Sequence, residues 1–405
     1  MRLYLTALKP TDSVTDGFLP AARALGCEVT ILTDRPEQYR DHGAEVLRCD
    51  VRDARAVVDT VAHHHTPDAI FSNSDHIQAE TALAAAYFGL PGKDWRACVD
   101  TKNKALTRRR LAAAGVETVR SARLAPADPP FTDVPFPAVV KPREGVASED
   151  VVLVHDADEL AAAVLSIRDR RPAETLVVEE YLDGPLHTME TLGDGERISV
   201  LGGFRTTLGP LPHFVEERLD WEPPPGRDHV LRALEALRVG LGACHTEYVM
   251  TPAGPRIIEV NYRVIGDHCD FLLASLLEVP LFELVLGAHL GAHLGARLGA
   301  HLGAHLGAHL GAELEAPAPA RVHGTVLSLV ADRSGTVVKA PGTVVPARGD
   351  PVRIWHRPLR AVGDRIDRSN TNRDYLGIVR ATGPDRASVD TAVAAFRAEN
   401  PWMIA

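Results

Sequence analysis

Four polar residues near the middle of the chain could bind a metal ion and a phosphate together. Glu247, Glu259, Asn261 and Arg263 lie on either side of a proline- and glycine-marked turn, in the stretch EYVMTPAGPRIIEVNYR. The flanks of this turn are rich in β-branched and apolar residues, which predicts a β-hairpin. Side chains two positions apart on a strand share a face, so Glu259, Asn261 and Arg263 are expected to point the same way.

The expected register of this hairpin places two carboxylates opposite each other. If the turn centres on Ala253, Glu247 lies directly across from Glu259. Opposed carboxylates repel, and a divalent cation removes that penalty. Carboxylate and amide oxygens suit magnesium. Arg263 lies about 13 Å further along the strand than Glu259, near enough to stabilise a phosphate that the metal also holds. The pattern indicates nucleotide chemistry.

Two lysines upstream of the hairpin could reach a phosphate. Lys141 ends the apolar strand 138–140 and precedes Pro142, so its ammonium would extend from a rigid base. Taken alone, it also fits a solvated strand end. Lys104 lies in the basic helix TKNKALTRRRLAAAGV, which by itself is also typical of an exposed basic face.

The segments that must position these residues alternate between strand and helix patterns. LYLTAL, EVTILTD and DAIFSNSD are typical of strands with helices between them, which predicts a parallel α/β sheet. FPAVVKP, DVVLVHD and TLVVEEYLDG follow as strands, with DADELAAAVLSIRDR as a helix between them. After an APAPA linker, short strands and a final helix indicate a separate small α+β unit. The first strand lacks a following Gly-x-Gly-x-x-Gly, which argues against a dinucleotide site there.

The order of these segments resembles the ATP-grasp superfamily over roughly residues 60–286, and its carboxylate–amine ligases in particular. The resemblance implies an α/β and α+β chain whose ATP-grasp fold follows a Rossmann-like pre-ATP-grasp domain. The expected divisions are the pre-ATP-grasp domain at 1–97, the ATP-grasp domain at 98–286 with a lid subdomain at about 118–178, a repeat and linker at 287–316, and a C-terminal accessory α+β domain at 317–405.

The resemblance also implies an ATP site. NKALTRRRLAAAGV and FPAVVKP resemble the two phosphate-binding segments, which places Lys104 near the α-phosphate and Lys141 near the α- and β-phosphates. VVEEYLDG resembles the hinge strand that holds the adenosine. Its residues are expected to act as follows: Glu180 and Leu182 offer backbone groups to adenine, and Glu179 or His187 approaches the ribose.

By the same resemblance the hairpin is the metal end of the site. Glu247, Glu259 and Asn261 would bind one or two Mg²⁺, with Mn²⁺ as an alternative ion. Arg263 and Lys141 would be the catalytic residues that stabilise the charge of phosphoryl transfer.

Two segments depart from the family's pattern. The lid loop REGVASEDV contains only Gly145 where the family usually has several glycines, with Ser148 as a phosphate contact. Asn-Tyr-Arg-Val-Ile-Gly-Asp-His stands where many members carry Asn-Pro-Arg followed by glycines. This second loop should border the acceptor pocket.

Five residues are expected to contact a substrate, although loop packing or surface exposure would also account for each of them. They are Tyr262, Asp267 and His268 in the acceptor loop, and Arg205 and His213, which fall where such enzymes often bind the carboxylate.

The resemblance implies an ATP-dependent, ADP-forming ligase that makes an amide bond through an acyl phosphate. The carboxylate would be an amino acid or a polycarboxylate, and the amide product would belong to secondary-metabolite, peptide or siderophore biosynthesis, because IIEVNYRVIGD is similar to siderophore ligases. Two alternatives stay open: an ATP-grasp carboxylase or kinase-like enzyme, and a non-catalytic ATP-binding module. The chain has no biotin-attachment segment, which weakens the carboxylase alternative.

Bulk properties narrow the class of protein. The net charge of −10 over 405 residues argues against a nucleic-acid partner. Five scattered cysteines suggest reduced thiols and a cytoplasmic protein. The sequence contains no uninterrupted run of about 18 apolar residues, so no membrane span is expected. Small-molecule carboxylate and amine substrates are the expected partners, and a homodimer is left open.

Residues 287–312 repeat Gly-Ala-His-Leu, with Arg297 in one histidine position. Four residues exceed a helical turn by about 40°, so the leucines would wind around a helix rather than form one face. Glycine at every fourth position costs roughly 1 kcal/mol against alanine. The segment is interpreted as a marginal helix or spacer. The alternative is a set of i,i+4 metal ligands: His289 with His293, or His301 with His305 and His309.

Overall fold

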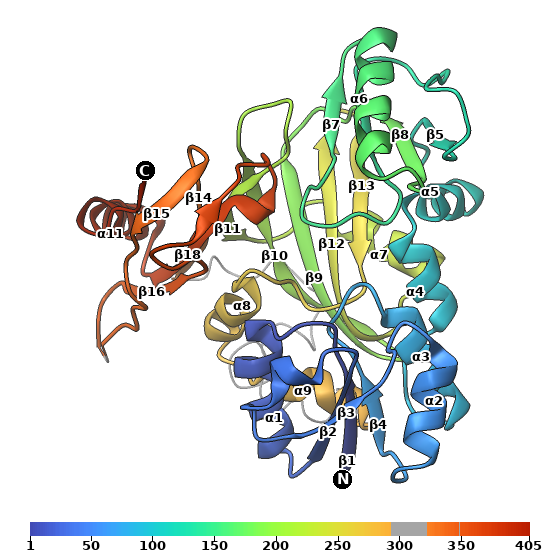
Figure 1. Cartoon of the computed structure of the whole chain (residues 1–405), viewed down its shortest axis with the longest axis vertical. Helices are drawn as coiled ribbons and strands as arrows, with labels where there is room; N and C mark the ends of the chain where they lie inside the picture. Colours follow the sequence, from blue (N-terminus) through green and yellow to red (C-terminus); the bar gives the residue numbers. More distant parts are fainter. Residues whose placement is uncertain (293–321, 348) are drawn as a thin grey trace.

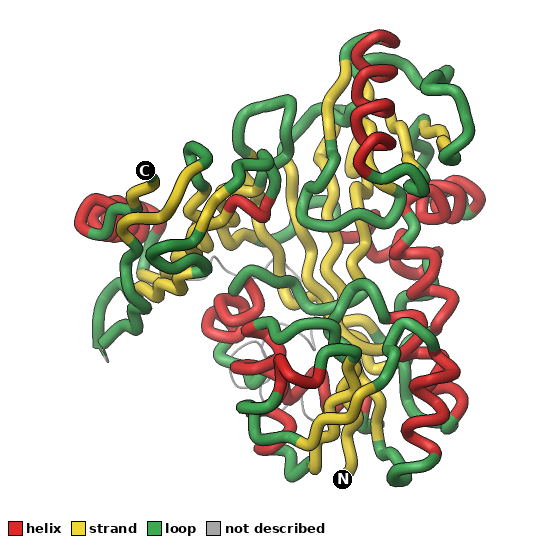
Figure 2. Tube along the Cα trace, viewed as in Figure 1, coloured by secondary structure: helices red, strands yellow, loops and turns green. Residues whose placement is uncertain are grey.

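The computed structural model describes residues 1–292, 322–347 and 349–405 and is built around one long, twisted sheet (Figures 1 and 2). An N-terminal unit lies at one end of this sheet, a lid covers the other end, and the C-terminal unit continues it to one side. Most of the tandem repeat lies outside the described residues, including His293, His301, His305 and His309.

The N-terminal unit is a four-stranded parallel sheet, as predicted, in the order β3-β2-β1-β4. The register places Leu3 beside both Val29 and Ala69. The strands are mostly buried because helices cover both faces of a parallel sheet. The strands are β1 (Arg2–Thr6), β2 (Glu28–Thr33), β3 (Glu45–Arg48) and β4 (Ala69–Phe71), and the helices are η1 (Ser13–Phe18), α1 (Leu19–Ala24), η2 (Pro36–Tyr39), α2 (Ala54–Ala62) and α3 (Gln78–Tyr87).

The central sheet has eight strands in the order β13-β12-β9-β10-β11-β14-β18-β16, and its neighbouring strands are antiparallel. Its first five strands in space come from the predicted ATP-grasp region: β9 (Leu186–Asp194), β10 (Ile198–Leu208), β11 (Glu216–Glu222), β12 (Leu241–Thr251) and β13 (Gly254–Asn261). The other three are β14 (His323–Val330), β16 (Arg353–Pro358) and β18 (Tyr375–Gly383). Pairing of Leu219 with Val326 joins the two groups.

The C-terminal unit therefore shares a sheet with the preceding region instead of forming a sheet apart from it. A small second sheet and one long helix complete this unit, and the helix packs its apolar face on β18 through Val389, Val393 and Phe396. These elements are β15 (Gly335–Lys339), β17 (Arg365–Ile366), β19 (Met403–Ile404), η3 (Asn372–Asp374) and α11 (Arg386–Glu399). The predicted domain boundaries remain predictions.

The lid is a four-stranded antiparallel sheet in the order β5-β8-β6-β7, covered on one face by α6 (Figure 1). Asp156 caps the start of α6 by accepting from two backbone N–H groups. Leu160, Val164 and Ile167 recur at helical spacing and pack on the sheet. The elements are β5 (Ser121–Leu124), β6 (Ala138–Pro142), β7 (Val152–Val154), α6 (Ala157–Arg170) and β8 (Leu176–Glu180).

Two further groups of helices join the units. Helices α4 (Trp95–Lys102), α5 (Lys104–Ala113) and α7 (Arg227–Ala236) pack against β12 and β13. Helices α8 (Cys269–Leu277) and α9 (Leu281–His289) pack between the central sheet and the N-terminal unit. Gly17 of η1 lies so close to the ring of Phe282 that a Cβ atom would lie 2.4 Å from it, so glycine is required at this contact.

No single helix among the described residues is long and apolar enough to cross a membrane. Helices α8 and α9 together pass that test by length and composition, but they meet at 100°. Most of their side chains pack in the hydrophobic core between the central sheet and the N-terminal unit.

Candidate active site

One cavity of about 990 Å³ opens where the lid, the central sheet, the N-terminal unit and the C-terminal unit meet. It brings together side chains that are far apart in the sequence. The predicted site residues that line it are Lys104, Lys141, Ser148, Glu179, Glu180, Leu182, Glu247, Glu259, Asn261, Arg263, Asp267 and His268. The predicted residues that do not line it are His187, Arg205, His213 and Tyr262.

The hairpin pairs Glu247 with Glu259, as predicted, but for a different reason. The turn is the two-residue Pro252–Ala253, with Thr251 facing Gly254, which by itself would not place the two glutamates opposite each other. A β-bulge between Glu247 and Tyr248 shifts the register by one residue and produces the pairing. Bulges of this kind re-aim side chains next to functional sites.

Each of these carboxylates already has one charged neighbour. Lys104 Nζ lies 2.9 Å from Glu259 Oε1, and His245 Nε2 lies 3.2 Å from Glu247 Oε1. Burial by itself would lower the pKa of Lys104, but Glu259 raises it above its ordinary value. Burial would raise the pKa of Glu247, and the His245 imidazolium holds it below its usual range. Glu247 is therefore ionised at neutral pH.

His245 is held by a second carboxylate behind it. Its Nδ1 lies 2.8 Å from Glu190 Oε1, and both residues are buried. Despite burial, Glu190 and Glu247 raise the pKa of His245 to about 10. The ring therefore remains an imidazolium and orients Glu247 toward the cavity. Neither His245 nor Glu190 was identified from the sequence.

The hairpin carries a donor set that fits a magnesium ion. Among the described residues, Oε2 of Glu247, Oε2 of Glu259 and Oδ1 of Asn261 have no hydrogen-bond partner, whereas Asn261 Nδ2 donates to Glu247 Oε1 over 3.3 Å. Mg²⁺ commonly takes one or two carboxylates and completes its shell with phosphate oxygens and water. The described chain has no cluster of three or more His, Cys, Asp or Glu side chains that could hold a metal, so phosphate oxygens would be needed.

Lys141 belongs to a buried chain of charges. Its Nζ lies 2.7 Å from Glu179 Oε2, and Arg108 Nε and Nη2 contact the two oxygens of the same carboxylate at 2.8 and 2.9 Å. Burial would raise the pKa of Glu179, but Arg108 and Lys141 lower it to about 2. Because both of its oxygens are engaged, Glu179 fixes Lys141 here, and this geometry does not support its predicted contact with the ribose.

Lys104 is positioned by the start of α5. Asn103 caps this helix by accepting from Leu106 N over 3.2 Å, which places Lys104 at the first helical position. Its ammonium also donates to Gly145 O of the lid loop over 3.1 Å. The lysine thus contacts the hairpin and the lid at once.

The lid loop between β6 and β7 compensates for its lack of glycine by backbone strain. Ala147, Ser148 and Asp150 have φ values of 58°, 54° and 57°, a left-handed conformation that costs roughly 1–2 kcal/mol per non-glycine residue. Ser148 Oγ donates to Phe214 O over 2.7 Å. Its hydroxyl is therefore committed to the protein, and its predicted contact with a phosphate stays a prediction.

The hinge residues lie at the cavity as expected. Glu180 and Leu182 both line it. Glu180 N donates to Arg120 O over 2.9 Å, and its carboxylate accepts from Arg120 N over 2.8 Å. These bonds join the end of β8 to the residue before β5, and contact with adenine remains a prediction.

Arg263 is not on the strand. β13 ends at Asn261, and Arg263 N donates back to Asn261 O over 2.7 Å, so the extended spacing expected from the sequence was wrong. Arg263 Nε lies 3.7 Å from Asp75 Oδ1, and Lys102 Nζ lies 2.6 Å from Asp75 Oδ2. Burial would raise the pKa of Asp75, but Lys102 and Arg263 hold it well below its ordinary value.

Asp75 was not identified from the sequence, although a signal was present. It belongs to the run Ser72–Asp75 directly after β4. Ligands of open α/β sheets bind outside the carboxyl ends of the parallel strands, where such polar runs lie.

The acceptor loop lines the cavity next to the N-terminal unit. Asp267 and His268 have φ values of 53° and 64°. His268 Nε2 lies 2.8 Å from Asp12 Oδ2, and Arg357 Nη2 donates to Asp12 Oδ1 over 2.8 Å. Asp12 thereby connects this loop to the C-terminal unit.

Tyr262 of the acceptor loop does not line the cavity, and its predicted substrate contact stays a prediction. It is buried, its hydroxyl donates to Leu241 O over 2.8 Å, and it accepts from Gly240 N over 2.9 Å. The ammonium of Lys93 lies 4.6 Å from the ring centroid. The ring would have to leave the core to reach a molecule in the cavity.

The other three residues lie outside the cavity on or next to β9 and β10. His187 Nδ1 lies 2.9 Å from Glu222 Oε1, and Arg205 is exposed on β10 opposite His187. His213 belongs to the loop between β10 and β11. Their predicted contacts with ribose or substrate have no support in the structure.

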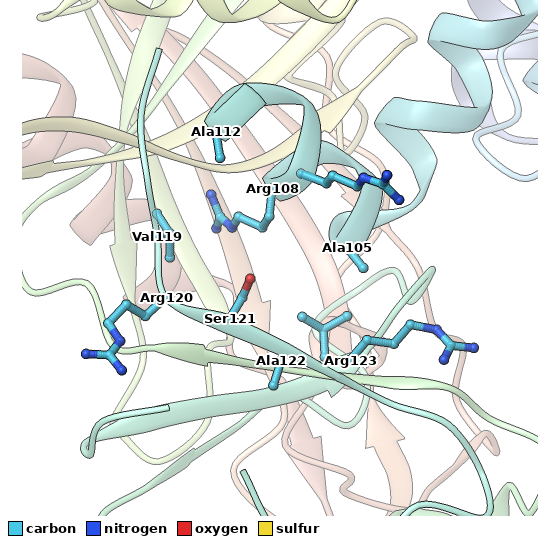
Figure 3. A pocket seen from close by; sticks show the side chains of 10 residues that line it. Ala105, Arg108, Ala112, Val119, Arg120, Ser121, Ala122 and Arg123 are labelled. Atoms are coloured by element: carbon cyan, nitrogen blue, oxygen red, sulfur yellow. The ribbon is translucent and has the colours of Figure 1, made fainter. Parts of the chain in front are cut away.

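A second, shallower cavity of about 430 Å³ lies between α5 and β5. Arginines contribute much of its lining, but Figure 3 shows the guanidinium groups of Arg120 and Arg123 pointing away from each other. The arginines therefore do not converge on one point, as an anion site requires.

Known proteins resemble this chain in sequence and in fold. No protein-family model matches the chain. An uncharacterised protein of Sinorhizobium fredii is 29% identical over 428 residues, which cover 100% of this chain and 84% of that protein. A phosphoribosylamine–glycine ligase of Streptomyces coelicolor is 29% identical over 268 residues. These cover 60% of this chain and 63% of the ligase, so the chain spans less than two thirds of that relative.

A solved structure shares the architecture of the whole chain. The L-amino acid ligase from Bacillus licheniformis superposes with a TM-score of 0.79 over 100% of this chain and 98% of that one. The two sequences are 21% identical, so the likeness shows the fold.

Proposed function

We propose that this chain, an ATP-grasp protein by its fold, is an ATP-dependent ligase that joins a carboxylate to an amine. The observation that carries this proposal is the composition of one cavity. In this cavity a nucleoside triphosphate would meet a second molecule. The space is lined by two lysines, Lys104 and Lys141, and by the paired carboxylates of Glu247 and Glu259. Two relatives that carry the name of ligases support the same reaction class.

The proposed reaction has two steps. A carboxylate oxygen of the first substrate attacks the γ-phosphorus of ATP, the bond to the β-phosphate oxygen breaks, and an acyl phosphate and ADP result. The amine then attacks the acyl carbon, phosphate leaves with the bonding electrons, and the amine loses a proton as the amide forms. The first step brings two anions together, and both steps need a site that excludes water.

The residues of the chain supply positioning and charge for these steps. Lys141, fixed by Glu179, faces the phosphates from the lid side, and Lys104 faces them from α5. Arg263 adds a guanidinium at the end of β13, held by Asp75. Such preorganised cations stabilise developing negative charge without reorganisation during the reaction.

The carboxylates of Glu247 and Glu259 and the amide oxygen of Asn261 would hold magnesium. The ion, when bound with the nucleotide, would screen the charge of the phosphates.

The reaction class is tested by offering carboxylates and amines in pairs with ATP and magnesium and measuring ADP and phosphate. Amino acids and polycarboxylates are the first candidates for the carboxylate. ADP release should require both members of one pair. Release of AMP and pyrophosphate, or ADP release that needs bicarbonate instead of a carboxylate and an amine, would contradict the proposal.

A further inference from the structure

The turn Thr371–Arg373 of the C-terminal unit holds the lid loop. Asn372 N donates to Ala147 O over 3.1 Å, and the guanidinium of Arg373 pairs with the carboxylate of Glu149. Both partners lie in the strained loop that covers the nucleotide half of the cavity. The closed position of this loop therefore depends on a segment more than two hundred residues further along the chain.

The same turn holds the wall of the cavity through Glu216. Asn372 Oδ1 accepts from Glu216 N over 3.0 Å, and Asn372 Nδ2 donates to Glu216 Oε2 over 3.1 Å. Tyr375 Oη donates to Glu216 O over 2.7 Å. Only one orientation of the Asn372 amide fits both contacts, because the backbone N–H of Glu216 needs an acceptor, which leaves Nδ2 to face the Glu216 carboxyl group.

The turn is rigid enough to transmit a displacement. Thr371 and Asp374 form a reciprocal capping box, and Asp374 is buried. The Asp374 carboxylate also accepts from Ser369 N and Ser369 Oγ. Asn372 therefore cannot follow the lid loop without moving the start of β18 as well.

Glu216 is the first residue of β11. It lines the cavity together with Asp267, and burial, Glu247 and Asp267 together raise its pKa to about 8. Three of the cations that act on Glu216 or Asp267 are paired with other carboxylates: His245 with Glu190, Arg263 with Asp75 and His268 with Asp12. The carboxyl groups of Glu216 and Asp267 offer hydrogen-bond acceptors on this wall, which suit the N–H groups of an amine substrate.

We propose that Asn372 is a positioning residue that links closure of the 143–151 loop over the nucleotide to the placement of Glu216 beside the amine substrate. This inference rests on the proposed function for the identity of the second substrate. The link itself rests on the contacts of Asn372, which reach the lid through the backbone and the acceptor wall through the side chain.

The test combines hydrogen–deuterium exchange with steady-state kinetics on the full chain. Exchange is followed in peptides that cover residues 143–151 and 212–220, with and without a non-hydrolysable ATP analogue and magnesium. In the unmodified protein the analogue should slow exchange in both peptides. In Asn372→Ala it should slow exchange only at 143–151, because the backbone contact to Ala147 survives. The KM for the amine should rise about tenfold while the KM for ATP stays within about twofold.

Two further variants separate positioning from a merely structural role. Asn372→Asp keeps the acceptor for Glu216 N but lacks the donor to its carboxylate, so it should restore slow exchange at 212–220 without restoring the KM for the amine. Asn370→Gly, two positions away, puts glycine at a left-handed position with φ of 56° and should match the unmodified protein in every measurement.

Each contrary result has a defined meaning. If the analogue slows exchange at 212–220 in Asn372→Ala as it does in the unmodified protein, or if the KM for the amine is unchanged, the link is overturned and the proposed function stands. If the unmodified protein shows no slowing at 143–151 with the analogue, the proposed function and the link both fail.

Discussion

At the scale of single residues, the structure explains why charged groups tolerate burial in this site. Lys104, Lys141 and Arg108 each face a carboxylate, and His245 bridges Glu190 and Glu247. A buried charge is costly unless it is paired, and removing one partner of such a pair is more damaging than replacing both. Changes at single members of these pairs should therefore have large and specific effects.

Glu259→Gln should lower turnover by at least about a hundredfold while the protein stays folded, because the variant loses one anionic metal ligand and leaves Lys104 without its partner. ADP release and the melting temperature measure the two parts of this prediction. Glu235→Gln, on the exposed face of α7, is the matched control and should change neither. Turnover of Glu259→Gln within a few fold of the unmodified protein would refute the metal assignment.

Glu179 should make stability depend on acid pH. Its pKa falls from 4.5 to about 2 on folding, so its carboxylate stabilises the folded state above pH 4.5, and this contribution of about 3 kcal/mol is lost as the pH falls toward 2. The free energy of unfolding of Glu179→Gln should therefore differ from that of the unmodified protein most at pH 6 and least at pH 3. The exposed Glu196→Gln serves as the control, and a difference that is constant with pH would contradict the assignment.

At the scale of elements, two irregular features, a β-bulge and a loop, shape the site. The β-bulge in the hairpin aligns Glu247 with Glu259, and the left-handed residues of the lid loop replace the glycines that the resemblance led us to expect. The pattern of a proline- and glycine-marked turn between β-branched and apolar flanks predicted the hairpin, and with a turn centred on Ala253 it predicted the paired glutamates. It could not reveal the bulge, because one extra residue in a strand leaves no separate mark on the pattern.

Ala147→Gly tests the strain of the lid loop. Alanine in the left-handed region carries a penalty of roughly 1 kcal/mol or more that glycine avoids, which offsets the entropy glycine adds to the unfolded chain. The substitution should therefore leave the free energy of unfolding unchanged or raise it. Ala162→Gly, on the exposed face of α6, should instead cost about 1 kcal/mol. Chemical denaturation of both variants provides the comparison, and an equal loss in both would show that the loop is unstrained.

At the scale of the whole molecule, the site exists only where four parts of the chain converge. The parallel N-terminal sheet, the hairpin and both lysines followed from local patterns and from the resemblance. Asp75, His245, Glu216 and Asn372 did not, because their roles come from contacts across long sequence separations. The joining of β11 to β14 is of the same kind, since local patterns do not specify which distant strands pair.

The central claim, an amide bond formed through an acyl phosphate, is tested most directly by oxygen transfer. Once the pair screen identifies the substrates, the carboxylate is labelled with ¹⁸O and the released phosphate is analysed by mass spectrometry. If the carboxylate attacks the γ-phosphorus and the amine then displaces phosphate, each phosphate formed carries one ¹⁸O atom from the carboxylate. Phosphate without the label, or label in AMP, would contradict the account.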